Sequence, residues 1–190
     1  MAGSAVAAAA LPGATQTGGC ADRDLALRHA AVPAAVASAA PPVPTVSAPP
    51  PDPYVSAEQA ALTAYRGMWQ AYAKAGATAN PDDADLARYA DGAALKTLRD
   101  GLASLRRKHQ VLKGQYRSNP HPADAPPSAP LSTVVVEDCL DDSEFLTYTA
   151  NGQLADSQPG GRRATRATVT LAGPGQWKVS SFGVQTVGTC

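Results

Sequence analysis

The sequence lacks both a membrane-spanning segment and an excess of charge. No apolar run reaches the roughly 18 residues that a membrane-spanning helix requires, so any attachment to a membrane has to be peripheral or covalent. The chain carries 16 basic and 16 acidic residues and has a formal net charge of zero. Without a global positive field, nucleic acid is a poor candidate for a partner.

Sequence patterns for common catalytic and metal sites are also missing. There is no glycine-rich phosphate loop, no G-x-S-x-G turn and no cysteine–histidine pairing. The three histidines, His29, His109 and His121, are far apart and show no spacing typical of zinc ligands. We therefore expect no metal and no cofactor.

Proline is unevenly distributed along the chain. Eight of the 17 prolines fall between Pro33 and Pro53, among Ala, Val and Ser residues that provide few large side chains for a core. We interpret residues 21–55 as a disordered, partly polyproline tether. Residues 56–190 remain to form one domain, which is long enough to bury a core without a metal.

Three cysteines make an odd count, which in a secreted protein calls for an explanation. Cys20 follows a weak apolar stretch and the small residues Gly18 and Gly19, so residues 1–20 look like a bacterial lipoprotein signal with Cys20 as the lipidated residue. The first basic residue is only Arg23, and Thr17 stands where such signals prefer Leu. Either a basic segment precedes Met1, or the chain is cytoplasmic with three free thiols.

Helical periodicity dominates the first half of the domain. Ser56 and Gln59 form a capping-box pattern, and apolar residues then recur at three- and four-residue spacing up to Gly76. A second helix is expected from Asn80 and Pro81 to about Ala90. A third should follow Asp91-Gly92 and present one apolar stripe, formed by Leu95, Leu98, Leu102 and Leu105.

After Gln110 the apolar period changes to two, which is typical of strands. The expected strands are 111–117, 131–140, 144–151, 163–172 and 176–187, with turns at 151–152 and 173–175. The proline-rich residues 118–130 are expected to form a loop. Helices followed by strands predict an α+β fold, with three N-terminal helices packed on a curved, mostly antiparallel sheet of about five strands.

Several short motifs together resemble those of small secreted actinobacterial lipoproteins of unknown function, with a cone-shaped domain similar to nuclear transport factor 2. The likeness covers roughly residues 56–190. The motifs are Tyr65-Arg66, K-G-x-Y at 113–116 followed by Pro120, E-D-C-x-D-D-S at 137–143, Asn151-Gly152, Q-W-K-V at 176–179 and the terminal cysteine. The resemblance implies a disulfide between Cys139 and Cys190; two free buried thiols are the alternative.

An acidic cluster lies around the second expected strand. Clustered carboxylates can raise one another's pKa or bind Ca²⁺, but the loop glycine and final glutamate of an EF-hand are missing. The simpler interpretation is a solvated turn partly balanced by Arg162, Arg163 and Arg166. The cluster consists of Glu137, Asp138, Asp141, Asp142 and Glu144.

Folds of the resembled type often enclose an apolar pocket, and some members are ketosteroid isomerases or polyketide cyclases. The candidate pocket residues are Tyr65, Tyr72, Tyr116 and Asp138, with Tyr89 and His109 as further polar groups. None stands in a motif that matches those enzymes, and aromatic residues at helical spacing are more often part of a core.

Three functions remain open. The first is a binding or assembly domain at the cell envelope, lipid-anchored and without catalytic activity, whose partner is an envelope protein or a small apolar ligand. The second is an isomerase, dehydratase or cyclase that uses Asp138 or a nearby tyrosine. The third is a purely structural scaffold in an envelope complex. Whichever of these functions applies, we expect the protein to be exported to an extracytoplasmic compartment, as a cell-surface lipoprotein or a secreted protein.

Overall fold

The computed structural model of the 190-residue chain describes residues 50, 52–124, 131–155 and 160–190. All of them belong to the unit that spans Ser47–Cys190. The expected signal segment, Cys20 and nearly all of the expected tether lie outside the described residues.

The first helix, α1 (Pro53–Gly76), begins earlier than the capping-box pattern predicts. Asp52 is the N-cap: its carboxylate accepts a hydrogen bond from the Tyr54 amide, while Pro53 supplies a φ angle suited to the first helical position. Ser56 therefore lies inside the first turn, where its hydroxyl donates to the Asp52 carbonyl. The helix ends at Gly76, as predicted.

The second helix, α2 (Ala84–Tyr89), is shorter than expected. The Asn80 side chain accepts a hydrogen bond from the Asp82 amide and forms a turn, so Asp83 becomes the N-cap instead. The third helix, α3 (Gly92–Arg107), confirms the predicted leucine stripe, of which Leu98 and Leu102 are buried. Arg106 and Arg107 occupy its last turn, where cations are favourable.

The strands follow the predicted order with one addition. They are β1 (Gln110–Gly114), β2 (His121–Pro122), β3 (Thr133–Asp141), β4 (Phe145–Thr149), β5 (Arg162–Gly173) and β6 (Gln176–Val184). All neighbouring strands pair antiparallel. The short β2 lies in the stretch expected to be only a loop, because His121 and Pro122 pair with Glu137 and Val136 at the edge of β3. Pro122 is tolerated there because it lies on an edge strand.

The described strands form two sheets where one was expected. One sheet has the order β2-β3-β5-β6, and β1 and β4 form a separate pair. Residues 115–120 connect β1 to β2 and make only a single bridge to the larger sheet, between Arg117 and Asp141. The turns at Asn151-Gly152 and at residues 173–175 are where the sequence predicts them, and Gly152 and Gly175 have positive φ angles.

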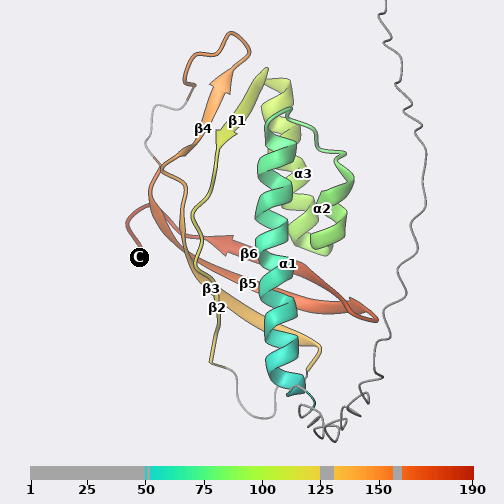
Figure 1. The fold of residues 1–190 in the computed structure, drawn as a ribbon. Helices are drawn as coiled ribbons and strands as arrows, with labels where there is room; N and C mark the ends of the chain where they lie inside the picture. Colours follow the sequence, from blue (N-terminus) through green and yellow to red (C-terminus); the bar gives the residue numbers. More distant parts are fainter. Residues whose placement is uncertain (1–49, 51, 125–130, 156–159) are drawn as a thin grey trace, which may run out of the picture. The chain divides into compact units, whose positions relative to one another are not determined.

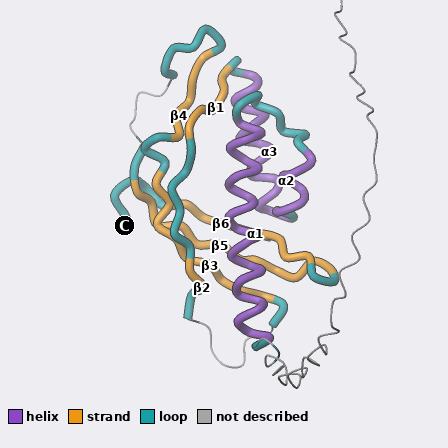
Figure 2. Tube along the Cα trace, in the orientation of Figure 1, coloured by secondary structure: helices purple, strands orange, loops and turns teal. Residues whose placement is uncertain are grey.

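The helices pack on one face of the larger sheet, as Figure 1 shows. Alternation along β3 directs Val136, Asp138 and Leu140 toward α1, while the residues between them point to the other face. The core combines Val136 and Leu140 with the apolar faces of α1 and α3. In Figure 2 the helices are purple and the strands orange, and the helices come before the strands along the chain. The predicted α+β class is therefore confirmed.

Candidate functional site

The polar centre of the domain is the carboxylate of Asp138, a buried residue with 5% exposure. Its Oδ2 accepts hydrogen bonds from the Tyr65 hydroxyl at 3.0 Å and from the Ser118 hydroxyl at 2.7 Å. Its Oδ1 accepts a third from the backbone amide of Asn119 at 2.8 Å. Three donors satisfy a buried charge that would otherwise be costly.

Tyr65 is placed on the buried face of α1, and its ring and hydroxyl are fully enclosed. Burial, followed by the negative charge of Asp138, raises the pKa of the Tyr65 phenol above its ordinary value. The Trp69 indole opposes this shift, although its Nε1–H makes no hydrogen bond of standard geometry within the described residues. Tyr65 is therefore a neutral donor to Asp138 at physiological pH.

The other two predicted pocket tyrosines lie in an aromatic cluster beside this centre. Tyr116 packs on Phe145 with ring centroids 4.1 Å apart and on Trp69 at 4.9 Å. Tyr72 contacts Trp69 and Phe145 at 6.3 and 6.5 Å. Burial raises the pKa of both phenols. The four residues predicted to line a pocket are thus neighbours, but Tyr72 and Tyr116 pack against the rings of Trp69 and Phe145.

Two further candidates do not join this centre. Tyr89 lies at the end of α2, where its ring is within 2.5 Å of the position that a Cβ on Gly67 would occupy. His109 is exposed in the turn after α3 and has a positive φ angle.

The simpler interpretation of the acidic cluster is confirmed only in part, because Glu137, Asp138 and Asp141 lie on β3 and Asp138 is buried, so the cluster divides into separate interactions. Asp142 forms an ion pair with Arg163 at 2.9 Å, Glu144 one with Arg117 at 2.7 Å, and Glu137 one with Arg166. The Ser143 amide donates to Asp141 and lowers the pKa of that carboxyl. Among the described residues, no group of three or more potential ligands could hold a metal ion.

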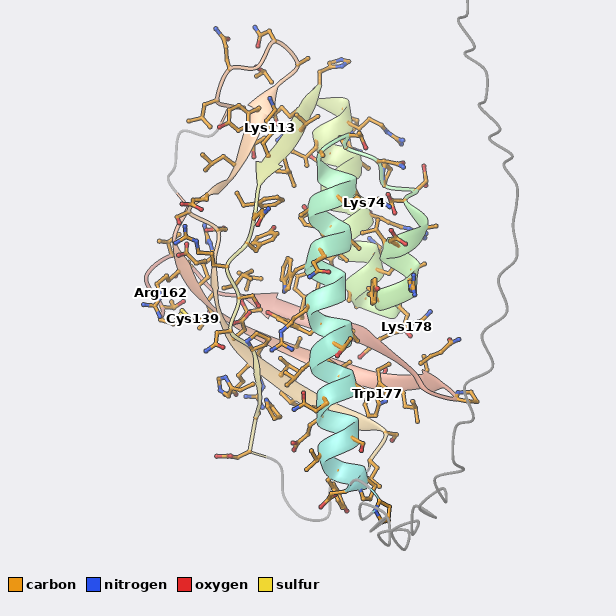
Figure 3. All side chains as sticks on the ribbon, in the orientation of Figure 1. Lys74, Lys113, Cys139, Arg162, Trp177 and Lys178 are labelled. Carbon is orange, nitrogen blue, oxygen red and sulfur yellow. A yellow bond between two sulfur atoms is a disulfide. The ribbon has the colours of Figure 1, made fainter. Side chains whose placement is uncertain are left out.

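A disulfide joins Cys139 on β3 to the C-terminal residue Cys190, with their Cα atoms 5.9 Å apart. The pairing implied by the resemblance is confirmed. It lies on the sheet face away from α1, where Figure 3 shows Cys139 beside Arg162, whose Nε donates to the Cys139 sulfur at 3.2 Å. Arg162 thus contacts the disulfide, and it also lies opposite Asp141 in the β3–β5 register, where its charge helps to lower the pKa of that carboxyl as expected.

An open groove, here called the α1–edge groove, lies between α1 and residues 114–118 and has a volume of about 610 Å³. Arg66, Gln70 and Lys74 line it from α1, and Tyr116 and Ser118 line it from the connecting segment. Figure 2 shows this segment running alongside α1. Sequence reasoning missed the groove, although two motifs of the family resemblance, Tyr65-Arg66 and K-G-x-Y at 113–116, contribute lining residues to it. The two motifs come together only through the path of residues 115–120, which the sequence does not predict.

Comparisons with known proteins do not assign this chain to a family. No family model and no curated protein matches the chain. Among solved structures, the chain is similar to the intermembrane space region of the chloroplast protein ARC6, with 16% sequence identity and a TM-score of 0.48 over 73% of this chain and 99% of that one. A likeness this distant carries no argument about function. No described helix is long and apolar enough to cross a membrane.

Proposed function

We propose that this chain is an extracytoplasmic binding or assembly domain, anchored to the cell envelope through a lipidated Cys20. This proposal includes membership of the small secreted lipoproteins that the sequence resembles, with their cone-shaped fold similar to nuclear transport factor 2. The domain would bind an envelope protein or a small apolar ligand.

The observation that carries the proposal is the disulfide between Cys139 and Cys190. Disulfides persist in oxidising compartments and are rare in the cytosol, so the bond is compatible with an extracytoplasmic location. It also ties the segment after β6 to β3, a central strand of the larger sheet, and a segment held in this way is a poorer site for proteolysis outside the cell.

The surroundings of Asp138 support binding over catalysis. A general base has to reach a substrate proton, but the Asp138 carboxylate is buried and accepts hydrogen bonds from Tyr65, Ser118 and Asn119. Tyr72 and Tyr116 pack against other rings. These groups support the packing of α1 on β3, and the open α1–edge groove provides an accessible surface for a partner.

Mass spectrometry of the native protein tests location and anchoring together. We expect the mature chain to begin at a lipidated Cys20, and thiol labelling of denatured, unreduced protein to modify neither Cys139 nor Cys190. A Cys20→Ser variant is the matched control. It should no longer be found in the membrane fraction, and its disulfide should remain intact. An unmodified Met1 at the N-terminus of the native membrane-bound or secreted protein would overturn the lipid anchor, and two reactive thiols in the domain would overturn the extracytoplasmic location.

A further inference from the structure

The connecting segment between β1 and β2 is an extended edge with one free side. Arg117 exchanges two backbone hydrogen bonds with Asp141, at 3.0 and 2.9 Å. In an extended chain, the backbone groups of the residues on either side point the opposite way. Within the described residues, neither Tyr116 nor Ser118 makes a backbone hydrogen bond. Their N–H and C=O groups therefore form an unpaired edge directed away from Asp141.

This free edge borders the α1–edge groove. Tyr116 and Ser118 are among its lining residues, and α1 forms its opposite wall. The side chains of these two residues are held in place, since Ser118 donates to Asp138 and Tyr116 packs on Phe145. The edge is therefore rigidly positioned, and a peptide that pairs with it would not have to order the segment first.

The charge of the groove indicates what kind of peptide fits. Arg66 is exposed and forms no ion pair within the part of the chain that the structure describes. Lys74 is held by Asp85 at 2.6 Å and Asp83 at 3.5 Å. The described lining residues include no aspartate or glutamate. An arginine without a partner beside free backbone donors favours a carboxylate.

We infer that the α1–edge groove binds an extended, acidic peptide segment of a partner protein, which adds as a strand to the free edge at Tyr116 and Ser118 and places a carboxylate on Arg66. Backbone pairing supplies affinity without sequence preference, while Arg66 and the exposed Gln70 select the side chains of the peptide. This inference rests on the proposed binding function and specifies its partner.

A random library of short linear peptides displayed on phage, selected on the purified, oxidised full-length chain, tests the inference. We expect the selected peptides to be rich in Asp and Glu and poor in Pro. Arg66→Glu should weaken their binding by about tenfold or more, whereas Arg99→Glu, an exposed arginine on α3 outside the groove, should leave it unchanged. Failure to enrich peptides above a denatured-protein control, or binding that is insensitive to Arg66→Glu, would overturn the inference.

Two further measurements separate strand addition from simple charge attraction. N-methylation of alternate amides in a selected peptide should abolish binding in one register and leave it intact in the other. Amide hydrogen exchange at Tyr116 and Ser118 should slow when the peptide binds. Equal effects of both methylation registers would overturn strand addition. Because these experiments use purified protein, their failure is independent of the mass-spectrometric test of export and anchoring.

Discussion

The phenolic oxygen of Tyr65 lies 3.0 Å from Oδ2 of Asp138, although the two residues are 73 positions apart in the chain. Tyr65 is on α1 and Asp138 is on β3, so this hydrogen bond connects the longest of the described helices to a central strand of the larger sheet. Both side chains are buried, and the hydrophobic core packs around the Tyr65 ring. A neutral donor thereby stabilises a buried negative charge.

Tyr65→Phe should lower the free energy of unfolding by about 1 to 3 kcal/mol, because the ring is retained and a hydrogen bond to a charged group is lost. Chemical denaturation measures the change. Tyr54→Phe is the matched control, since Tyr54 is 50% exposed and its hydroxyl makes no hydrogen bond among the described residues. Equal stability of the Tyr65→Phe variant and the wild type would show that Asp138 is satisfied by Ser118 and Asn119 alone.

Local sequence signals predict most of the helices, strands and turns, but they do not predict how the strands pair into sheets. The helix end at Gly76, the leucine stripe of α3 and the two turns follow from periodicity and turn residues. The position of the first N-cap was wrong, since Asp52 and Pro53 together form a stronger start than Ser56. The division into two sheets was missed because it depends on where a connecting segment pairs, which alternation cannot specify.

The candidate site shows the same limit. Sequence reasoning selected Tyr65 and Asp138, which the fold brings together, yet Ser118 and the Asn119 amide were not foreseen as their partners. A serine and a backbone amide in a proline-rich stretch carry no sequence signal for binding a carboxylate. Only the path of the segment between β1 and β2 places them beside β3.

Loss of the disulfide should destabilise the domain by about 4 kcal/mol in the loop-entropy model, because the two cysteines are separated by 51 positions. The Cys139→Ala/Cys190→Ala double variant, compared with the wild type in denaturant, measures this. Adding a reductant should lower the stability of the wild type and leave the double variant unchanged. If the reductant destabilised both proteins equally, its effect could not be assigned to this bond.

Alkaline pH should unfold the domain through its buried tyrosines. Burial raises the pKa of Tyr65, Tyr72 and Tyr116 above the ordinary value of 10.0, so the folded state holds these protons more tightly than the unfolded state. The stability they contribute is fully present below pH 10.0 and decreases as the pH rises above it. We expect the phenolate absorbance of these three residues to rise together with the loss of circular dichroism.

Tyr65→Phe provides the control for this titration. It should remove the contribution of one phenol from the absorbance change that accompanies unfolding, while the other two remain. Ionisation of Tyr65, Tyr72 or Tyr116 in a protein whose circular dichroism is still native would contradict the prediction.

Gly114 ends β1 at the wall of the α1–edge groove, and its position excludes any side chain. Its φ angle is +101°, and an added Cβ would lie 1.7 Å from the carbonyl oxygen of Glu144. Because that oxygen belongs to the backbone, it cannot move aside as a flexible side chain could. Gly114→Ala should therefore lower the free energy of unfolding by about 3 kcal/mol or more, as combined steric overlap and backbone strain predict.

Two other glycines separate these contributions in the same denaturation experiment. Gly152 has a φ angle of +83° and nothing within 4 Å of an added Cβ, so Gly152→Ala should cost only the strain of the left-handed backbone, about 1 to 2 kcal/mol. Gly183 has neither a positive φ angle nor a close neighbour, so Gly183→Ala should change stability least. If Gly114→Ala were no more destabilising than Gly152→Ala, the close approach of Glu144 to the end of β1 would be wrong, and with it the path of the segment that forms the groove.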